Sequence, residues 1–300
     1  MTTDSPADYD FCEFGFDRWN PVQLGCVPFF TEDCNLVLSS STATGKTAVA
    51  EAIFGYELSK GGKTAYASPL KAINDEKFLR WSRHPTFEEF PKCLLSSENR
   101  QDEKTLADSR MVISTVESLA VQCRRNALWL SGLSALVLDE AHLIGDSSRG
   151  GGCEEMLLSL TRINPSCRII LLSGTMANCK EMAAWIKSLN GKKTRFVHSE
   201  WRPAELEKSV VALKDFHKGI SSEIAKACSS IQEKTLVFVH SRKFGERICR
   251  ELNDKGFKCG FYHAGLTDSR KRRLVEDFRS EWSDIRILIC TSSLGAGVDL

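Results

Sequence analysis

Small and hydroxyl-bearing residues lead up to a lysine at residues 40–47, where the sequence reads SSTATGKT. A short apolar run at residues 36–38 precedes this segment, and a helix-like segment at 47–58 follows it. In a loop between a strand and a helix, the backbone amides and the helix N-terminus can bind nucleotide phosphates. Lys46 would add a positive charge, and the Thr47 hydroxyl suits Mg²⁺. The nucleotide-binding candidates are therefore Ser40, Ser41, Thr42, Ala43, Thr44, Gly45, Lys46 and Thr47, with Ser40 standing where the usual pattern has glycine.

Two carboxylates, Asp139 and Glu140, end the apolar run at residues 136–138. Ligands of parallel α/β sheets bind at the carboxyl ends of the strands, so this pair can face the phosphate loop. We expect Asp139 to hold Mg²⁺ and Glu140 to orient and deprotonate an attacking water. Together with Lys46 they form the candidate catalytic set, and the expected chemistry is hydrolysis of a nucleoside triphosphate.

Short apolar or β-branched runs alternate with helix-like segments, which predicts parallel sheets with helices on both faces. The first predicted strands are residues 36–38, 64–67, 111–114, 135–138 and 168–172. The pattern then restarts with strands at 235–239, 260–263 and 286–289, and with helices at 244–255 and 269–278 between them. The sequence therefore predicts an α/β fold in two domains.

The join between the domains is expected near Trp201-Arg202-Pro203, where a proline interrupts the pattern. We place the first domain at residues 1–200, a linker and the start of the second domain at 201–230, and the rest of the second domain at 231–300. Because few strands precede Leu300, we expect the second domain to be incomplete.

Composition excludes several classes of protein. Hydrophobic residues make up 42% and charged residues 26% of the 300, which is a globular composition, and the net charge is only +1. The 12 cysteines include no CxxC pair, which argues against a zinc ribbon or an iron–sulfur cluster. The first residues are polar and acidic, and no apolar run approaches the roughly 20 residues of a membrane span. We expect reduced thiols in an intracellular protein with no membrane partner.

The phosphate loop and the acidic pair resemble motifs I and II of superfamily-two helicases, the second being a DEAH box. Other segments resemble the remaining motifs of that family in the same order. They are SPLKAI at 68–73 (motif Ia), STVE at 114–117 (Ib), SGT at 173–175 (III), VHSR at 239–242 (IV), YHAGL at 262–266 (the motif after IV) and TSSLGAGVD at 291–299 (V). The resemblance implies two tandem RecA-like P-loop domains that hydrolyse ATP with Mg²⁺ to move along a nucleic acid strand.

The branch of the family can be narrowed. Ala43 in the loop, the PLKA run and the WRP segment look most like the Ski-two-like branch, and within it like the archaeal fork-repair helicases, helicase Q and the helicase domain of polymerase theta. This resemblance implies a DNA-repair helicase that moves 3′ to 5′ on single-stranded or forked DNA, in the cytoplasm of a prokaryote or the nucleus of a eukaryote. RNA remains the alternative strand, because RNA-processing members share most of these motifs. The oligomeric state is not readable from the sequence.

The resemblance also assigns roles to single residues. Gln23 would read the adenine edge through its paired donor and acceptor, and Gly297 and Asp299 would approach the nucleotide ribose. The expected contacts with the nucleic acid strand are Lys71, Thr115, Arg242 and Thr291. The residues expected to couple the two sites are His142, Ser173 and Thr175.

Several residues have a simpler structural interpretation. Trp81, Trp129 and Trp201 could stack on bases, but a role in a core or an interface is favoured. Without the family resemblance, Thr115 would be interpreted as a helix cap and Lys71 as a solvated lysine. The basic run at 270–273 is most simply a solvated helix face, with added strand binding as the alternative.

The family's motif VI, which carries an arginine finger, is not found in the sequence after motif V. Because that arginine stabilises charge on the transferred phosphoryl group, we expect these 300 residues to bind ATP·Mg²⁺, to hydrolyse it poorly and not to unwind DNA. Two other interpretations stay open: a nucleic-acid-binding fragment without turnover, and another phosphate-loop enzyme such as a nucleotide kinase or a transporter ATPase.

Overall fold

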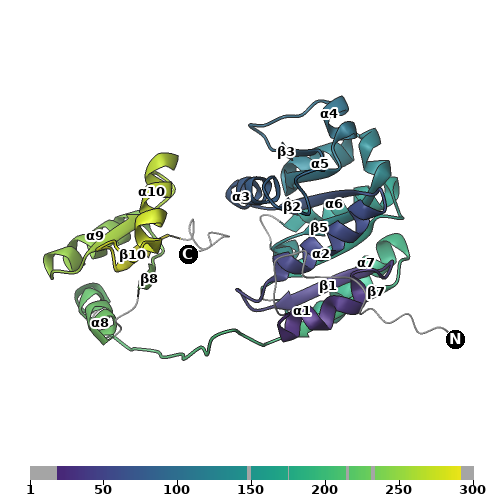
Figure 1. Cartoon of the computed structure of the whole chain (residues 1–300). Helices are drawn as coiled ribbons and strands as arrows, with labels where there is room; N and C mark the ends of the chain where they lie inside the picture. The colour runs from purple at the N-terminus through teal and green to yellow at the C-terminus, as the bar shows by residue number, and fades with distance from the viewer. Residues whose placement is uncertain (1–18, 147–149, 175, 214–215, 231–233, 292–300) are drawn as a thin grey trace. The chain divides into compact units, whose positions relative to one another are not determined.

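A computed structural model describes residues 19–146, 150–174, 176–213, 216–230 and 234–291. The chain divides into two compact units between Glu205 and Leu206, and strands alternate with helices in each (Figure 1). The predicted α/β fold with two tandem domains is confirmed. No helix among the described residues is long and apolar enough to cross a membrane.

The first unit contains one parallel sheet of seven strands in the order β3-β4-β2-β5-β6-β1-β7. The strands are β1 (Asn35–Ser40), β2 (Lys63–Ser68), β3 (Lys92–Leu95), β4 (Met111–Thr115), β5 (Leu133–Leu138), β6 (Arg168–Ser173) and β7 (Thr194–Ser199). The helices are α1 (Pro21–Cys26), α2 (Lys46–Ser59), α3 (Lys71–Trp81), α4 (Glu103–Asp108), α5 (Val116–Arg124), α6 (Gly150–Ile163) and α7 (Cys179–Asn190). Short 3-10 turns are η3 (Val27–Phe29), η4 (Leu128–Gly132) and η5 (Ala141–Gly145).

Both faces of this sheet are buried under helices. Because successive residues of a strand point to opposite faces, Leu136 and Leu138 of β5 pack into one core while Val137 packs into the other. Helices α5, α6 and α7 cover the first face, and α1, α2 and α3 cover the second. Trp81 and Trp129 are buried in these cores, which confirms the core role favoured for them. All seven strands are parallel, so their carboxyl ends lie along one edge.

The second unit is smaller. Its described elements are α8 (Phe216–Ser230), β8 (Thr235–Phe238), α9 (Arg242–Asp254), β9 (Cys259–Tyr262), α10 (Asp268–Arg279) and β10 (Ile287–Cys290). The three strands pair in parallel in the order β8-β10-β9. Ile248 and Leu252 of α9 pack against Ile289 on one side of this sheet, and Phe278 of α10 packs with Leu288 on the other.

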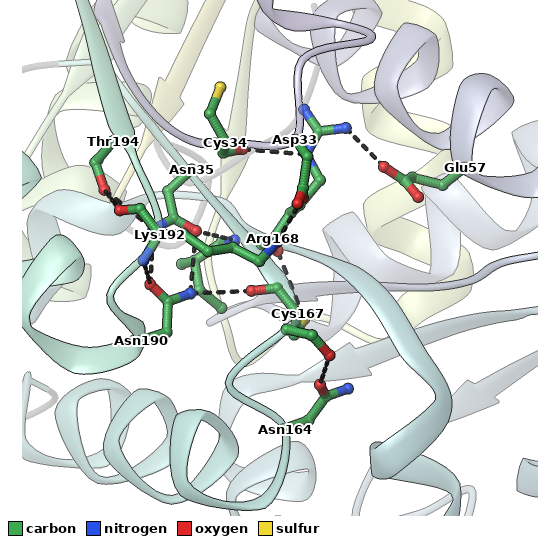
Figure 2. Close-up of polar contacts among 12 residues, drawn as sticks. Asp33, Cys34, Asn35, Glu57, Asn164, Cys167, Arg168, Asn190, Lys192 and Thr194 are labelled. Carbon is green, nitrogen blue, oxygen red and sulfur yellow. Dashed lines mark hydrogen bonds and ion pairs between the residues drawn. The ribbon is translucent and has the colours of Figure 1, made fainter.

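A buried polar network fixes the amino ends of the central strands of the first unit (Figure 2). The Arg168 side chain, at the start of β6, is almost fully buried and pairs with Glu57 of α2 at 2.6 Å. Its guanidinium also donates to the carbonyls of Phe29, Phe30 and Cys34. These bonds hold the segment between α1 and β1. The phosphate loop therefore lies at one end of β1, and a fixed anchor lies at the other.

Candidate functional site

The phosphate loop joins β1 to α2 and is braced from inside by its own hydroxyls. The Thr44 hydroxyl is fully buried, donates to the Ser41 carbonyl at 2.9 Å and lies 2.7 Å from the Ser40 hydroxyl. Thr42 and Ala43 are exposed at the tip. Ser40 and Thr44 thus shape the loop through their side chains, and its backbone amides are the groups suited to phosphate.

Lys46 begins α2 and folds back over the loop. Its Nζ atom donates to the Ser40 carbonyl at 3.0 Å and to the Ser41 carbonyl at 2.8 Å. Burial lowers the pKa of Lys46, and the negative charges of Asp139 and Glu140 oppose that shift. The loop therefore holds one half-buried ammonium group within electrostatic reach of both carboxylates.

Gln23 contacts the loop from α1. Its side chain accepts from the Asn20 backbone amide at 2.9 Å, which closes a capping box at the helix start, and its Nε2 donates to the Gly45 carbonyl at 3.4 Å. Gly45 has φ of 73°, and a Cβ there would lie 2.3 Å from Gln23 Nε2. Asn20 also donates to the Thr44 carbonyl at 2.9 Å. Asn20 was not singled out from the sequence, although an Asn followed three residues later by Gln is a helix-start signature.

Asp139 and Glu140 follow β5 at the same edge of the sheet. The Asp139 backbone amide donates to Ala67 of β2 at 2.9 Å, which extends the strand pairing by one residue. The Asp139 carboxylate accepts from the Glu140 amide at 2.9 Å and from the Tyr66 hydroxyl at 2.5 Å. Glu140 has a left-handed backbone with φ of 54°. Burial and the neighbouring Asp139 charge raise the pKa of Glu140, as suits a group that must accept a proton.

His142 connects the acidic pair to β6. Its Nδ1 atom lies 3.3 Å from Glu140 Oε2 and 3.4 Å from the Ser173 hydroxyl. The structure thus brings together two of the three residues expected to couple the sites. Thr175, the third, lies outside the described residues.

The first-unit residues expected to contact the nucleic acid strand lie at this same carboxyl edge of the sheet. Thr115 pairs in register with Ser68 at the ends of β4 and β2. Its hydroxyl caps α5 by accepting from the Ser118 amide at 3.3 Å. Lys71 begins α3 and forms an ion pair with Glu98. Thr115 therefore caps a helix, as expected without the family resemblance. This cap is compatible with a further contact between Thr115 and a nucleic acid strand.

In the second unit, Arg242 and Thr291 lie at the carboxyl edge of the small sheet. Arg242 begins α9 and pairs with Glu246 at 2.8 Å. Thr291 directly follows β10, and its backbone amide donates to the Tyr262 carbonyl. His263, next along from Tyr262, is buried and accepts from the Gly265 amide at 3.1 Å. Gly297 and Asp299 lie outside the described residues.

The residues at the first-unit edge fit a magnesium–nucleotide complex. Mg²⁺ prefers oxygen ligands and is usually held by one or two carboxylates together with substrate phosphates, not by an all-protein cage. Among the described residues, no cluster of three His, Cys, Asp or Glu side chains could hold a metal ion. Asp139 and the Thr47 hydroxyl supply oxygen atoms of the type required.

Comparison with known proteins identifies the family. The model of the DEAD/DEAH box helicase family matches residues 20–182, and that of the helicase conserved C-terminal domain matches residues 218–300. A curated relative is "ATP-dependent DNA helicase Hel308" of Methanocella arvoryzae, which is 29% identical, with 89% of this chain and 42% of the relative covered. The chain spans less than half the length of the curated relatives it matches.

Two solved structures share the fold. The chain superposes on Saccharomyces cerevisiae Dbp5 bound to RNA and ADP BeF3 with a TM-score of 0.67 and 20% identity, covering 95% of this chain and 73% of the other. It superposes on Mycobacterium smegmatis helicase Lhr bound to single-stranded DNA and AMP-PNP with a TM-score of 0.69 and 21% identity, covering 96% and 42%. Its two units are thus RecA-like helicase domains, and the predicted similarity to archaeal Ski-two-like helicases is confirmed. The chain belongs to the DEAD/DEAH box helicase family.

Proposed function

We propose that this chain is the motor of an ATP-dependent DNA helicase that moves 3′ to 5′ along a single strand. The proposal rests on one arrangement: Lys46 in the loop after β1, and Asp139 and Glu140 directly after β5, lie at the carboxyl edge of one parallel sheet. Hydrolysis of a nucleoside triphosphate requires a lysine that binds the phosphates, a carboxylate that binds the metal ion and a carboxylate that binds the attacking water.

The expected roles follow from the chemistry of each side chain. Lys46 would leave the loop carbonyls and bind the β- and γ-phosphates. Thr47 and Asp139 would hold Mg²⁺, which when bound neutralises charge on the phosphates. Glu140 would accept a proton from the water that attacks the γ-phosphorus, so that ADP and phosphate leave. Gln23 would recognise the adenine, and Gly297 and Asp299 would contact the ribose from the second domain.

Movement on a strand would use groups that contact the backbone and not the bases. Thr115 and Lys71 in the first unit, and Arg242 and Thr291 in the second, are the proposed contacts. His142, Ser173 and Thr175 would relay the state of the γ-phosphate to these contacts. DNA is preferred over RNA because the curated relatives include proteins named as DNA helicases.

The test of the motor is ATP hydrolysis with and without single-stranded DNA, in the wild type and in Lys46→Ala. We expect the wild type to bind ATP and to hydrolyse it at a low rate that single-stranded DNA raises, and Lys46→Ala to lose both hydrolysis and ATP binding. Lys60→Ala is the matched control, because Lys60 lies at the other end of the same helix, next to Tyr56. A wild type that binds no ATP, or a Lys46→Ala variant that still hydrolyses it, would refute the proposal.

The type of nucleic acid and the direction of movement along it need separate assays. Single-stranded DNA and RNA of one sequence should differ in their stimulation of hydrolysis, and equal stimulation would remove the preference for DNA. Duplexes with a 3′ or a 5′ overhang test direction in a protein that joins these 300 residues to a motif VI, since a motor that moves 3′ to 5′ acts on the 3′ overhang.

A further inference from the structure

A tyrosine outside all the motifs donates a hydrogen bond to the proposed metal-binding carboxylate. Tyr66 lies in the middle of β2, next to β5, and is 1% exposed. Its hydroxyl reaches the Oδ2 atom of Asp139 at 2.5 Å. A buried tyrosine hydroxyl needs a polar partner, and here that partner is a carboxylate at the end of the neighbouring strand.

Together with a bond from the backbone, this bond fixes both oxygens of the Asp139 carboxylate. The other oxygen, Oδ1, accepts from the Glu140 backbone amide at 2.9 Å. Each carboxylate oxygen therefore has one donor from the protein. Since a carboxylate offers about four acceptor positions in all, roughly half remain for a metal ion or its water.

The Tyr66 ring is itself held in place. It packs edge-on against Trp81 of α3, with ring centroids 5.2 Å apart. The Trp81 indole in turn donates at 2.7 Å to Glu51, a fully buried carboxylate of the phosphate-loop helix α2. Tyr66 therefore has little freedom to move away from Asp139.

We propose that Tyr66 is a positioning residue for the metal site: its hydroxyl holds Asp139 in the orientation that binds Mg²⁺ together with the nucleotide. This inference rests on the proposed function of Asp139. Hydrogen bonds to a metal-binding carboxylate fix its direction, and losing such a partner commonly weakens metal binding about 10–100-fold. The sequence motifs do not assign Tyr66 this role.

The test is Tyr66→Phe in the full chain, which removes one oxygen atom and keeps the ring against Trp81. Binding of a fluorescent non-hydrolysable ATP analogue is titrated over a range of Mg²⁺ concentrations and in EDTA. We expect the half-saturating Mg²⁺ concentration to rise about 10-fold or more, while nucleotide affinity in EDTA stays unchanged. Tyr56→Phe is the control, because the Tyr56 hydroxyl lies on the exposed side of α2 beside Lys60.

A double-mutant cycle with Asp139→Ala tests the direct link. Without the carboxylate, adding Tyr66→Phe should change the Mg²⁺ dependence no further. A Tyr66→Phe variant with the Mg²⁺ dependence of the wild type would overturn the inference. So would an equal loss of nucleotide affinity with and without Mg²⁺, since that is the mark of a merely structural role. A wild type that binds no nucleotide in either condition would overturn the proposed function, and this inference with it.

Discussion

The Nδ1 atom of His142 lies 3.3 Å from the Oε2 atom of Glu140. The same nitrogen is 3.4 Å from the Ser173 hydroxyl at the end of β6. His142 thus links the Glu140 carboxylate, in the turn after β5, to the adjacent strand β6. A side chain held in this way can act on a water molecule at a defined position.

Glu140→Gln should separate binding from hydrolysis. The amide keeps the shape of the side chain but cannot accept the proton of the attacking water, so kcat should fall about 100-fold or more. Nucleotide affinity should stay near that of the wild type, because Lys46 and the loop are unchanged. Single-turnover ATP hydrolysis and equilibrium binding of a fluorescent ATP analogue measure the two quantities.

Glu103→Gln serves as the control for that variant. Glu103 begins α4, is exposed and has no ion pair with any side chain in the part of the chain that the structure describes. Both its hydrolysis and its binding should match the wild type. A Glu140→Gln variant that turns over ATP at the wild-type rate would exclude Glu140 as the base.

The central strands and the motif residues could be predicted because their signals are local. The buried strands β1, β2, β4, β5 and β6 appear in the sequence as short apolar runs, and the motif residues follow directly after them. The two outer strands, β3 and β7, were not predicted. In β7 the exposed Phe196 and His198 alternate with half-buried residues, and an edge strand that faces solvent lacks a continuous apolar run.

Contacts between residues far apart in the chain could not be predicted from the sequence either. Tyr66 stands inside an apolar run, and nothing near it indicates that its partner is Asp139, 73 positions away. Arg168 is a charged residue at the start of a strand, where a solvated side chain is the usual expectation, yet it is buried against Glu57, 111 positions away. Such pairs depend on strand order, which periodicity alone does not give.

Ala43→Gly should stabilise the phosphate loop. Ala43 has φ of 60°, a left-handed conformation that costs a residue with a Cβ about 1–2 kcal/mol. Glycine removes that cost but adds about 0.5–1 kcal/mol of unfolded-chain entropy, so the net gain should be about 1 kcal/mol or less. Ala48→Gly is the matched control: Ala48 is buried in α2, and the change should destabilise by about 1 kcal/mol or more. Urea unfolding measures both, and equal destabilisation by the two changes would contradict the assignment of strain to Ala43.

Glu32 should make stability depend on pH in the acid range. Hydrogen bonds from Arg195 and Lys193 lower the pKa of the Glu32 carboxyl from 4.5 to about 2. Because the pKa is lower in the folded state, the stabilisation is present above pH 4.5 and is lost as the pH falls through about 2. Glu32→Gln should therefore have a lower melting temperature than the wild type at pH 7, and the gap should narrow steadily as the pH falls below 4.5. The gap should be small, because the ion pairs are partly exposed. A gap that stays constant with pH would show that the charge of Glu32 is not its cause.

Arg168→Met should be the most destabilising of these changes. The substitution leaves the Glu57 carboxylate without its partner and removes the donor to three backbone carbonyls, those of Phe29, Phe30 and Cys34. Breaking a buried ion pair by removing one partner costs about 3–5 kcal/mol. Arg124→Met is the matched control, since Arg124 pairs with Glu155 on the surface at 2.9 Å and such pairs contribute about 0–1 kcal/mol. Urea unfolding of the two variants compares the costs.

Glu57→Gln added to Arg168→Met separates the two parts of that cost. Removing the second charge relieves the uncompensated carboxylate, so stability should partly return. It should not return fully, because each buried carbonyl left without a donor still costs about 1–3 kcal/mol. Full recovery in the double variant would mean that the ion pair alone matters, and that Arg168 does not anchor the segment between α1 and β1. Partial recovery, together with weaker nucleotide binding, would mean that the anchor at the amino end of β1 also helps to hold Gln23 against the phosphate loop.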